Sequence, residues 1–212
     1  GGDRLAAGAP CRRPLSWQKL ERVLTLLKIA VTGGLASGKS TVCELLERRG
    51  ATVVSSDAIV ADLRTIYASD IQEACGTTDR HELAERLFDH PSELARLEAI
   101  LHPPLLHEIQ QRYKEASERG APLFVCELPL LFEKGWEIYF DRTVAVYTPT
   151  EIARDRYGRS VDYDRRMKRQ LSPEVKAERA DIVIDNRGSK EALTEAINAL
   201  FEGITQDERR DT

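Results

Sequence analysis

The sequence predicts an α/β fold built around a parallel sheet, and three observations support this prediction. Short apolar runs rich in valine and isoleucine recur along the chain and are typical of strands. Amphipathic segments with apolar residues at helical spacing lie between these runs. The first run leads through a glycine-rich loop into such a helix and then into a second run, an order that places the two strands parallel in one sheet.

Composition excludes several classes of protein. The 212 residues are 42% hydrophobic and 31% charged, which is typical of a globular chain with one domain, or with one domain that carries a large insertion. The formal net charge of −4 argues against a protein whose main ligand is nucleic acid. No apolar run approaches the roughly 18 residues that a membrane-spanning helix needs, so no membrane partner is expected.

The cysteines indicate a reducing environment. Cys11, Cys43, Cys75 and Cys126 form no Cys-x-x-Cys pair and have no histidine at zinc-binding spacing. We therefore expect four reduced thiols and a cytoplasmic location. Cys43 and Cys126 lie inside apolar segments and are predicted to be buried.

Residues 1–25 are predicted to form a flexible extension outside the fold. This stretch is rich in small residues and arginine, and it lacks the continuous apolar core of a secretory signal. A transit peptide and an artefact of the start site are both compatible with it.

The first part of the core, residues 26–57, follows the strand–loop–helix–strand order. A buried strand is expected over 27–32. The next helix, over 40–49, carries apolar residues on one face and stops at Gly50. A second strand follows over 51–55.

Residues 58–120 break this rhythm and predict a helical insertion. Helices are expected over 80–88 and over 91–101, the second opened by a proline at a first-turn position. We expect the His102-Pro103-Pro104 sequence to end that helix, and a further helix to run over 105–119.

The core resumes over residues 121–204. Its predicted strands cover 123–128, 143–148 and 182–184. Residues 150–180 form an arginine-rich segment within the core, and a final amphipathic helix is expected over 190–204. The charged tail 205–212 is expected to fray.

Residues 33–40 read GGLASGKS and match the pattern G-x-x-x-x-G-K-[ST]. Glycines in this pattern let successive amide groups turn inward around an anion, and the helix that follows adds partial positive charge. Lys39 is expected to reach the β- and γ-phosphates of a nucleotide, and the Ser40 hydroxyl to bind Mg²⁺. The expected nucleotide-binding residues are Gly33, Gly34, Leu35, Ala36, Ser37, Gly38, Lys39, Ser40 and Thr41.

Two carboxylates follow predicted strands, at the sheet edge where ligands of open α/β folds bind. Asp57 fits a residue that takes a proton from an attacking hydroxyl, and it equally fits a cap for the helix that begins at Ala58. Glu127 either reaches Mg²⁺, directly or through water, or pairs with a neighbouring lysine. Glu133 is interpreted as an exposed loop residue without a chemical role.

Arginines crowd the 150–180 segment: Arg154, Arg156, Arg159, Arg165, Arg166 and Arg169. Such residues often form a solvated helix face, but guanidinium groups also match the charge of a phosphoryl group during its transfer. In the insertion, Arg80 and His102 are further polar candidates. His102 stands before two prolines, which favours a helix-end or packing role over a catalytic one.

These features resemble one family, the dephospho-coenzyme A kinases, over residues 27–204. The resemblance rests on residues 31–40, the segment around Asp57, Arg80 with Leu83 and Phe88, Leu101-His102-Pro103, the PLLFE sequence at 129–133, Gln170 with Lys176, and the ADIVIDN sequence at 180–186. Many kinases share the phosphate loop, whereas the PLLFE and ADIVIDN sequences are far more specific.

The resemblance implies a three-layer P-loop kinase fold with a parallel sheet, a helical acceptor-binding insertion and an arginine-rich lid. It implies ATP- and Mg²⁺-dependent phosphorylation of the ribose 3′-hydroxyl of dephospho-coenzyme A, the last step of coenzyme A synthesis. The expected partner is this small molecule, with neither nucleic acid nor membrane, and the chain is expected to be a monomer or a weak oligomer.

The resemblance also implies roles for individual residues. Asp57 falls where the family has its proposed general base. The implied sets are Lys39, Asp57, Arg154 and Arg166 for catalysis, the phosphate loop with Asn186 for the nucleotide, Asp57, Arg80 and His102 for the acceptor, and Ser40 with Glu127 for the metal.

The sequence departs from the family pattern in three ways. It reads Ser55-Ser56-Asp57 where the family usually has Asp-x-Asp, and Glu127 stands where aspartate is usual. The segments between Arg64 and Arg80 and before Gln170 are shorter than usual. Two other functions stay open, namely a kinase for a nucleoside, nucleotide or sugar acid, and a nucleotide-dependent switch, although no Asn-Lys-x-Asp motif supports the switch.

Overall fold

The structure, a computed structural model, describes residues 26–158 and 160–210. Its strands are β1 (Lys28–Gly33), β2 (Thr52–Ser55), β3 (Phe124–Glu127), β4 (Arg142–Tyr147) and β5 (Ile182–Asp185). Its helices are α2 (Lys39–Glu47), α3 (Ser56–Ile66), α4 (Ala68–Cys75), α5 (Arg80–Asp89), α6 (Pro91–Glu118), the 3-10 helix η2 (Trp136–Tyr139), α7 (Thr150–Tyr157), α8 (Ser160–Met167), α9 (Pro173–Arg179) and α10 (Lys190–Arg210). The predicted extension over 1–25 lies outside the described residues.

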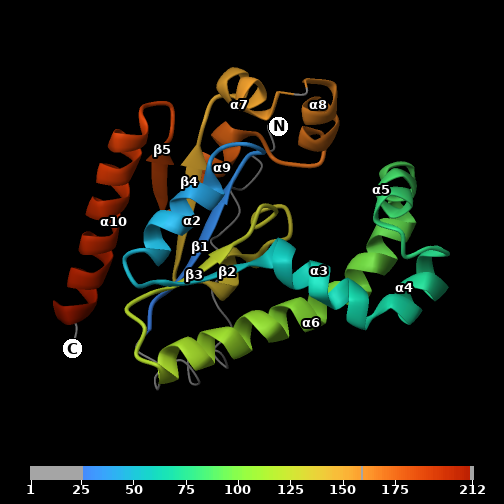
Figure 1. The fold of residues 1–212 in the computed structure, drawn as a ribbon, viewed down its shortest axis with the longest axis horizontal. Coiled ribbons are helices and arrows are strands. Elements are labelled where there is room, and N and C mark those ends of the chain that lie inside the picture. The colour runs from blue at the N-terminus through green and yellow to red at the C-terminus, as the bar shows by residue number, and fades with distance from the viewer. Residues whose placement is uncertain (1–25, 159, 211–212) are drawn as a thin grey trace, which may run out of the picture.

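The strands form one parallel five-stranded sheet in the order β2-β3-β1-β4-β5 (Figure 1). β1 is central and buried along its whole length, because strands of parallel sheets have both faces covered. The crossover connections bring all carboxyl ends of the strands to one edge. The predicted α/β class and parallel sheet are confirmed.

Helices cover both faces of the sheet, which gives three layers. On one face, Ile29 of β1 packs with Val42 of α2 and Ile197 of α10. On the other face, Ala30 of β1 belongs to a core that includes Leu105 of α6. Because neighbouring residues of a strand point to opposite faces, a single central strand anchors both cores.

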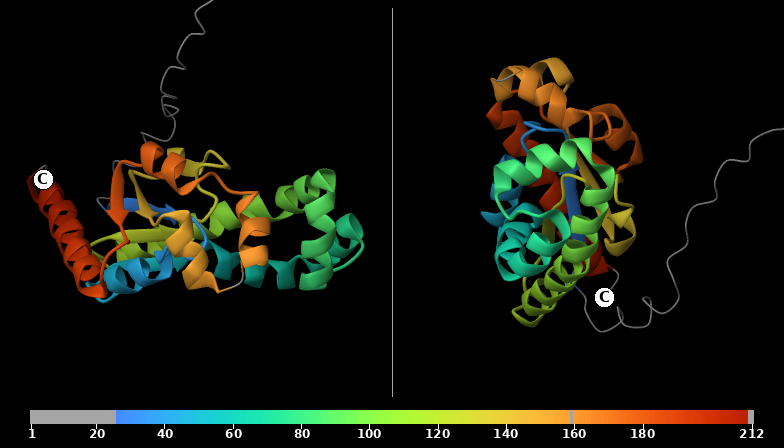
Figure 2. Two further views of the ribbon diagram at one scale, coloured as in Figure 1. Left: turned by 90° about the horizontal axis from the view of Figure 1, so that it is seen from above. Right: turned by 90° about the vertical axis from the view of Figure 1, so that its right-hand side faces the viewer.

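The insertion between β2 and β3 consists of α3, α4, α5 and α6, and it extends the molecule away from the sheet. In the left view of Figure 2, α10 lies at one end of the molecule and α4 and α5 lie at the other. α6 runs from this distal end back beneath the sheet (Figure 1).

The predicted end of a helix at His102-Pro103-Pro104 is wrong. α6 continues through both prolines to Glu118, although each proline removes an amide donor from the helix. Leu97, Leu101 and Leu105 follow one another at four-residue spacing and are all buried. Packing of this apolar stripe compensates for the missing hydrogen bonds, since tertiary contacts supply most helix stability in proteins.

α10 also runs further than predicted. It continues past residue 204 to Arg210, so residues 205–210 are helical, and the expected fraying of the tail stays a prediction. This stretch contains neither glycine nor proline, and a helix already nucleated by buried residues propagates through it.

The buried positions of Cys43 and Cys126 are confirmed, and Cys75 is buried as well. Within residues 26–158 and 160–210, none of the helices combines the length and the apolar character that crossing a bilayer requires.

Candidate active site

The carboxyl ends of the strands bring the predicted site residues together. β1 ends at Gly33, the first residue of the predicted phosphate loop. The adjacent strand β3 ends at Glu127, which is paired in register with Ser55 at the end of β2. Asp57 lies just beyond β2, and Asn186 follows β5. Residues that are far apart in the sequence therefore meet at one edge of the sheet.

The phosphate loop leads directly into α2. Gly38 precedes the helix with a φ of 94°, and Ala36 has a φ of 56°, so both residues adopt left-handed backbone conformations. The first turn of α2 reads KSTV, which combines a cation and two hydroxyls with the unpaired amides of a helix N-terminus. These groups all favour a bound anion.

Side chains after β4 and β5 brace the loop at Ser37. Nδ2 of Asn186 donates to the Ser37 carbonyl at 2.8 Å, and the Thr148 hydroxyl donates to the same oxygen at 3.0 Å. Arg156 donates from Nη2 to the carbonyl of Asn186 at 2.9 Å. Asn186 thus lies against the loop, and its contact with a nucleotide stays a prediction.

We expect Gly38→Ala to weaken ATP binding. A Cβ at this position would lie 2.2 Å from Nδ2 of Asn186, and the φ of 94° is itself strained for alanine. The loop must shift to accommodate the methyl group, so the Kd for ATP measured by calorimetry should rise about tenfold or more. Gly203→Ala is the matched control, because a Cβ there meets nothing within 4 Å. Unchanged ATP binding by Gly38→Ala would contradict this expectation.

The ammonium group of Lys39 is buried within the loop. Its Nζ donates to two carbonyls of the loop, at 3.1 and 2.7 Å. Burial lowers the pKa of Lys39 from 10.5 to about 8, and Lys176 adds to the lowering, whereas Glu127 and Asp57 oppose it. Both carboxylates therefore lie within electrostatic reach of the ammonium, and a bound polyphosphate would stabilise its charged form further.

The pKa of Lys39 predicts that kcat/KM for ATP decreases at alkaline pH. Below about pH 8 the free protein carries the Lys39 ammonium, and above it the proton and the charge are lost. We expect kcat/KM for ATP to fall above about pH 8, because this quantity reports the free enzyme. At saturating ATP, kcat should fall only at higher pH, since bound phosphates hold the proton on. A kcat/KM for ATP that stays level above pH 8 would contradict the assignment.

Ser40 and Glu127 contact each other across the site. Oγ of Ser40, in the first turn of α2, donates to Oε1 of Glu127, at the end of β3, at 3.2 Å. The two residues are 87 positions apart in the sequence. Glu127 thus contacts a hydroxyl, with Lys39 within electrostatic reach. The geometry brings a hydroxyl and a carboxylate oxygen together at the N-terminus of α2, and their binding of Mg²⁺ stays a prediction.

Asp57 does not cap α3. The cap is Ser55, whose side chain accepts a hydrogen bond from the amide of Ala58 at 3.5 Å. Asp57 lies in the first turn of the helix and is exposed, where the helix dipole stabilises a carboxylate. The capping interpretation is therefore wrong, and the side chain is accessible to a substrate.

The arginine-rich segment forms α7, α8 and α9, and Figure 1 shows α7 and α8 beyond the carboxyl ends of the strands. Arg154 of α7 forms an ion pair with Asp164 of α8 and lies 5.8 Å from the ring centroid of Tyr163. Arg166 lies 6.0 Å from the ring centroid of Tyr157. These contacts join α7 to α8, and the contact of both arginines with phosphate stays a prediction.

The two candidates in the insertion differ in their surroundings. The His102 ring packs edge-on against Trp136 at 4.7 Å between centroids, and burial lowers the pKa of His102, so the ring is neutral near pH 7. This environment favours the packing interpretation. Arg80 is exposed at the first residue of α5. Binding of an acceptor by either residue stays a prediction.

The interpretation of Glu133 as an exposed residue is wrong. Its side chain is 12% exposed and pairs with Lys176, which is 0% exposed, at 3.0 Å between Oε1 and Nζ. The amide of Leu171 donates to the same oxygen at 2.7 Å. The available signal was the apolar context of Glu133, because Leu131 and Phe132 directly before it are buried.

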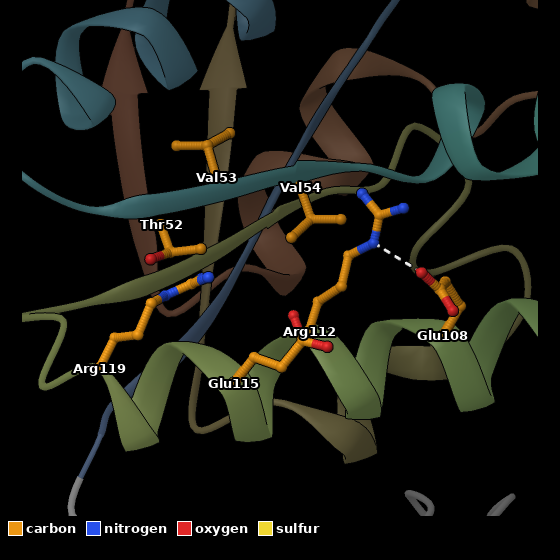
Figure 3. A pocket seen from close by; sticks show the side chains of 7 residues that line it. All are labelled: Thr52, Val53, Val54, Glu108, Arg112, Glu115 and Arg119. Carbon is orange, nitrogen blue, oxygen red and sulfur yellow. Dashed lines mark hydrogen bonds and ion pairs between the residues drawn. The ribbon is translucent and has the colours of Figure 1, made fainter.

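An open hollow of about 340 Å³ lies between α6 and β2 (Figure 3). Its lining residues are Thr52, Val53, Val54, Glu108, Arg112, Glu115 and Arg119. Within it, Nε of Arg112 donates to Oε1 of Glu108 at 2.8 Å, so part of its charge is already paired. The hollow shares no residue with the phosphate loop, and we assign it no part in the reaction.

Together, the parallel sheet, the phosphate loop at the end of its central strand and the acidic residue on the adjacent strand define a P-loop kinase. A shikimate kinase from Acinetobacter baumannii has the same fold, with a TM-score of 0.52 at 16% identity over 90% of this chain and 97% of that one. At this identity the likeness concerns the fold alone.

Closer similarity identifies the family. The family model for dephospho-CoA kinase matches residues 27–192. A dephospho-CoA kinase from Protochlamydia amoebophila is 36% identical over 202 residues, covering 86% of this chain and 98% of that protein. A crystal structure from Thermus thermophilus has a TM-score of 0.75 at 34% identity, over 84% of this chain and 97% of that one. The chain belongs to the dephospho-CoA kinase family, which confirms the resemblance.

Proposed function

We propose that the protein transfers the γ-phosphoryl group of ATP to the ribose 3′-hydroxyl of dephospho-coenzyme A, giving ADP and coenzyme A. Membership of the family supports this acceptor. The observation that carries the proposal is the convergence of Lys39, Asp57 and Glu127 at the phosphate loop. The two carboxylates lie near enough to the Lys39 ammonium to raise its pKa. A cation for phosphate and a carboxylate for the acceptor hydroxyl are the groups that this transfer needs.

The loop and its lysine stabilise the group in transfer. Loop amides and Lys39 hold the β- and γ-phosphates and offset the charge that spreads over the phosphoryl oxygens. Asp57 takes the proton of the 3′-hydroxyl while the new O–P bond forms and the bond to the β–γ bridging oxygen breaks. Arg154 and Arg166 approach the phosphates as the lid closes, and closure excludes water.

Ser40 and Glu127 fit a Mg²⁺ site. One hydroxyl and one carboxylate oxygen lie 3.2 Å apart, and Mg²⁺ in kinases is held by few protein oxygens together with substrate phosphates. The ion would neutralise charge on the β- and γ-phosphates. Ser40 and Glu127 would hold it at the N-terminus of α2.

The insertion and the lid complete the assignment. We assign residues 58–120, with Arg80 and His102, to acceptor binding, and residues 150–180 to the lid. Asn186 is assigned to the nucleotide side of the site, since it lies against the loop at Ser37. The three buried free thiols support a cytoplasmic location, and a monomer or weak oligomer stays our expectation.

A coupled assay for ADP release tests the function. We expect turnover with ATP, Mg²⁺ and dephospho-coenzyme A, and little with adenosine, a nucleoside monophosphate or a sugar acid. Product analysis should place the phosphate on the ribose 3′-oxygen. Faster turnover with one of the other acceptors would replace the proposed substrate, and nucleotide hydrolysis that depends on a partner protein would favour a switch.

A further inference from the structure

An ion pair between a fully buried lysine and a largely buried glutamate lies beside the reaction site and takes no part in the chemistry described above. Nζ of Lys176 donates to the carbonyl of Pro129 at 2.5 Å and pairs with Oε1 of Glu133 at 3.0 Å. Burial lowers the pKa of Lys176, and the hydrogen bond to Glu133 opposes this effect. Removing two charges from water is costly, so such a pair contributes little net stability. Its contacts point to a different role.

The first set of contacts leads to the phosphate loop. The carbonyl of Pro129 that binds Lys176 also accepts the Thr32 hydroxyl at 3.4 Å. Thr32 directly precedes Gly33, where the loop begins, and Pro129 lies two positions after Glu127. Lys176 therefore fixes the backbone that carries both the loop and the candidate metal ligand.

The second set of contacts leads to the lid. Glu133 accepts the amide of Leu171, in the segment where the chain returns from α8 to α9. Both ends of this segment lie beside the phosphate loop, because a Cβ on Gly34 would lie 3.5 Å from Cγ of Pro173, the first residue of α9, and 3.8 Å from Cε of Met167, the last residue of α8. Glu133 therefore binds the segment between α8 and α9 where its ends lie beside the phosphate loop.

We propose that Lys176 and Glu133 are positioning residues that fix the C-terminal hinge of the lid to the phosphate loop. The proposal rests on the proposed function, because it concerns where the phosphoryl group goes. With the hinge fixed, the lid closes in register with Lys39 and the acceptor, and the γ-phosphoryl group passes to the acceptor hydroxyl. With the hinge loose, closure is incomplete, and water attacks the same phosphorus to give ADP and inorganic phosphate.

The test compares two rates in one protein. In Lys176→Met, we expect the ratio of acceptor phosphorylation to acceptor-free ATP hydrolysis to fall roughly ten- to a hundredfold, since a small misplacement of reacting groups has effects of this size. A partly unfolded sample lowers both rates equally and leaves the ratio unchanged. The ratio therefore separates a positioning role from a merely structural one.

A second variant and a control make the test decisive. Glu133→Gln keeps an oxygen for the Leu171 amide but removes the negative charge that faces Lys176, so it should lower the ratio in the same direction and less strongly. It also decides the case if Lys176→Met does not fold in a thermal melt. Lys190→Met changes an exposed lysine at the start of α10 and should leave the ratio unchanged.

The outcomes distinguish this proposal from the proposed function. If the unaltered protein does not phosphorylate dephospho-coenzyme A, the proposed function is wrong. If it does, and the folded variants Lys176→Met and Glu133→Gln both keep the unaltered ratio, the positioning proposal alone is overturned.

Discussion

Asp57→Asn is expected to lower kcat roughly 10²–10⁴-fold, because a positioned general base contributes a factor of this size. The amide has nearly the same shape as the carboxylate but cannot take the proton of the acceptor hydroxyl. Binding of ATP should survive, since the phosphate loop and Lys39 are unchanged. The measurement is steady-state kinetics with dephospho-coenzyme A, together with calorimetric titration of ATP.

Asp62→Asn provides the control for this variant. Asp62 is an exposed aspartate on the same helix, α3, so the substitution makes the same change of carboxylate to amide at a position away from the sheet edge. Its kcat should match that of the unaltered protein. An Asp57→Asn variant with an unaltered kcat would show that another group, or none, removes the proton.

Lys39→Met removes the cation of the phosphate loop and should lower kcat roughly 10²–10³-fold, as loss of one preorganised charge-stabilising group does. The methionine keeps most of the buried aliphatic volume, so the effect is electrostatic. The KM for ATP should rise as well, because Lys39 binds phosphate in the ground state and in the transition state. Both quantities follow from initial rates over a range of ATP concentrations.

Lys114→Met is the matched control, since Lys114 is exposed on α6 and pairs there with Glu118. Thermal melts establish that both variants fold. Turnover by Lys39→Met at the unaltered rate would be incompatible with the role of the loop proposed here, whatever the acceptor.

Local pattern was sufficient to predict the centre of the fold. The strand β1, the loop of residues 33–40 and the helix α2 are contiguous, and their glycines and apolar spacing carry a physical signal within some twenty residues. The strand ends that follow were predicted in the same way. Because parallel strands bring their carboxyl ends together, the meeting of Glu127 with Ser40 followed from topology.

Features that depend on tertiary packing were missed. Glu133 and Lys176 are 43 positions apart by their numbering, and nothing in the local sequence of either residue shows that the other is its partner in an ion pair. The course of α6 through two prolines depends on an apolar stripe packing against the core, which overrides local propensity. The capping alternative for Asp57 lies two residues beyond the cap that the structure shows, because Ser55 is both the last residue of β2 and the cap of α3.

The prolines in α6 weaken its backbone hydrogen bonding at one turn. A helix of 28 residues is about 42 Å long, so α6 is a rod with one end under the sheet and the other carrying α4 and α5. Proline offers no amide hydrogen, and the carbonyls of Ala99 and Ile100 therefore lose their helical donors at mid-length. The buried leucines Leu97, Leu101 and Leu105 span this turn, so side-chain packing takes over from the backbone ladder in keeping the rod straight between the sheet and the distal end.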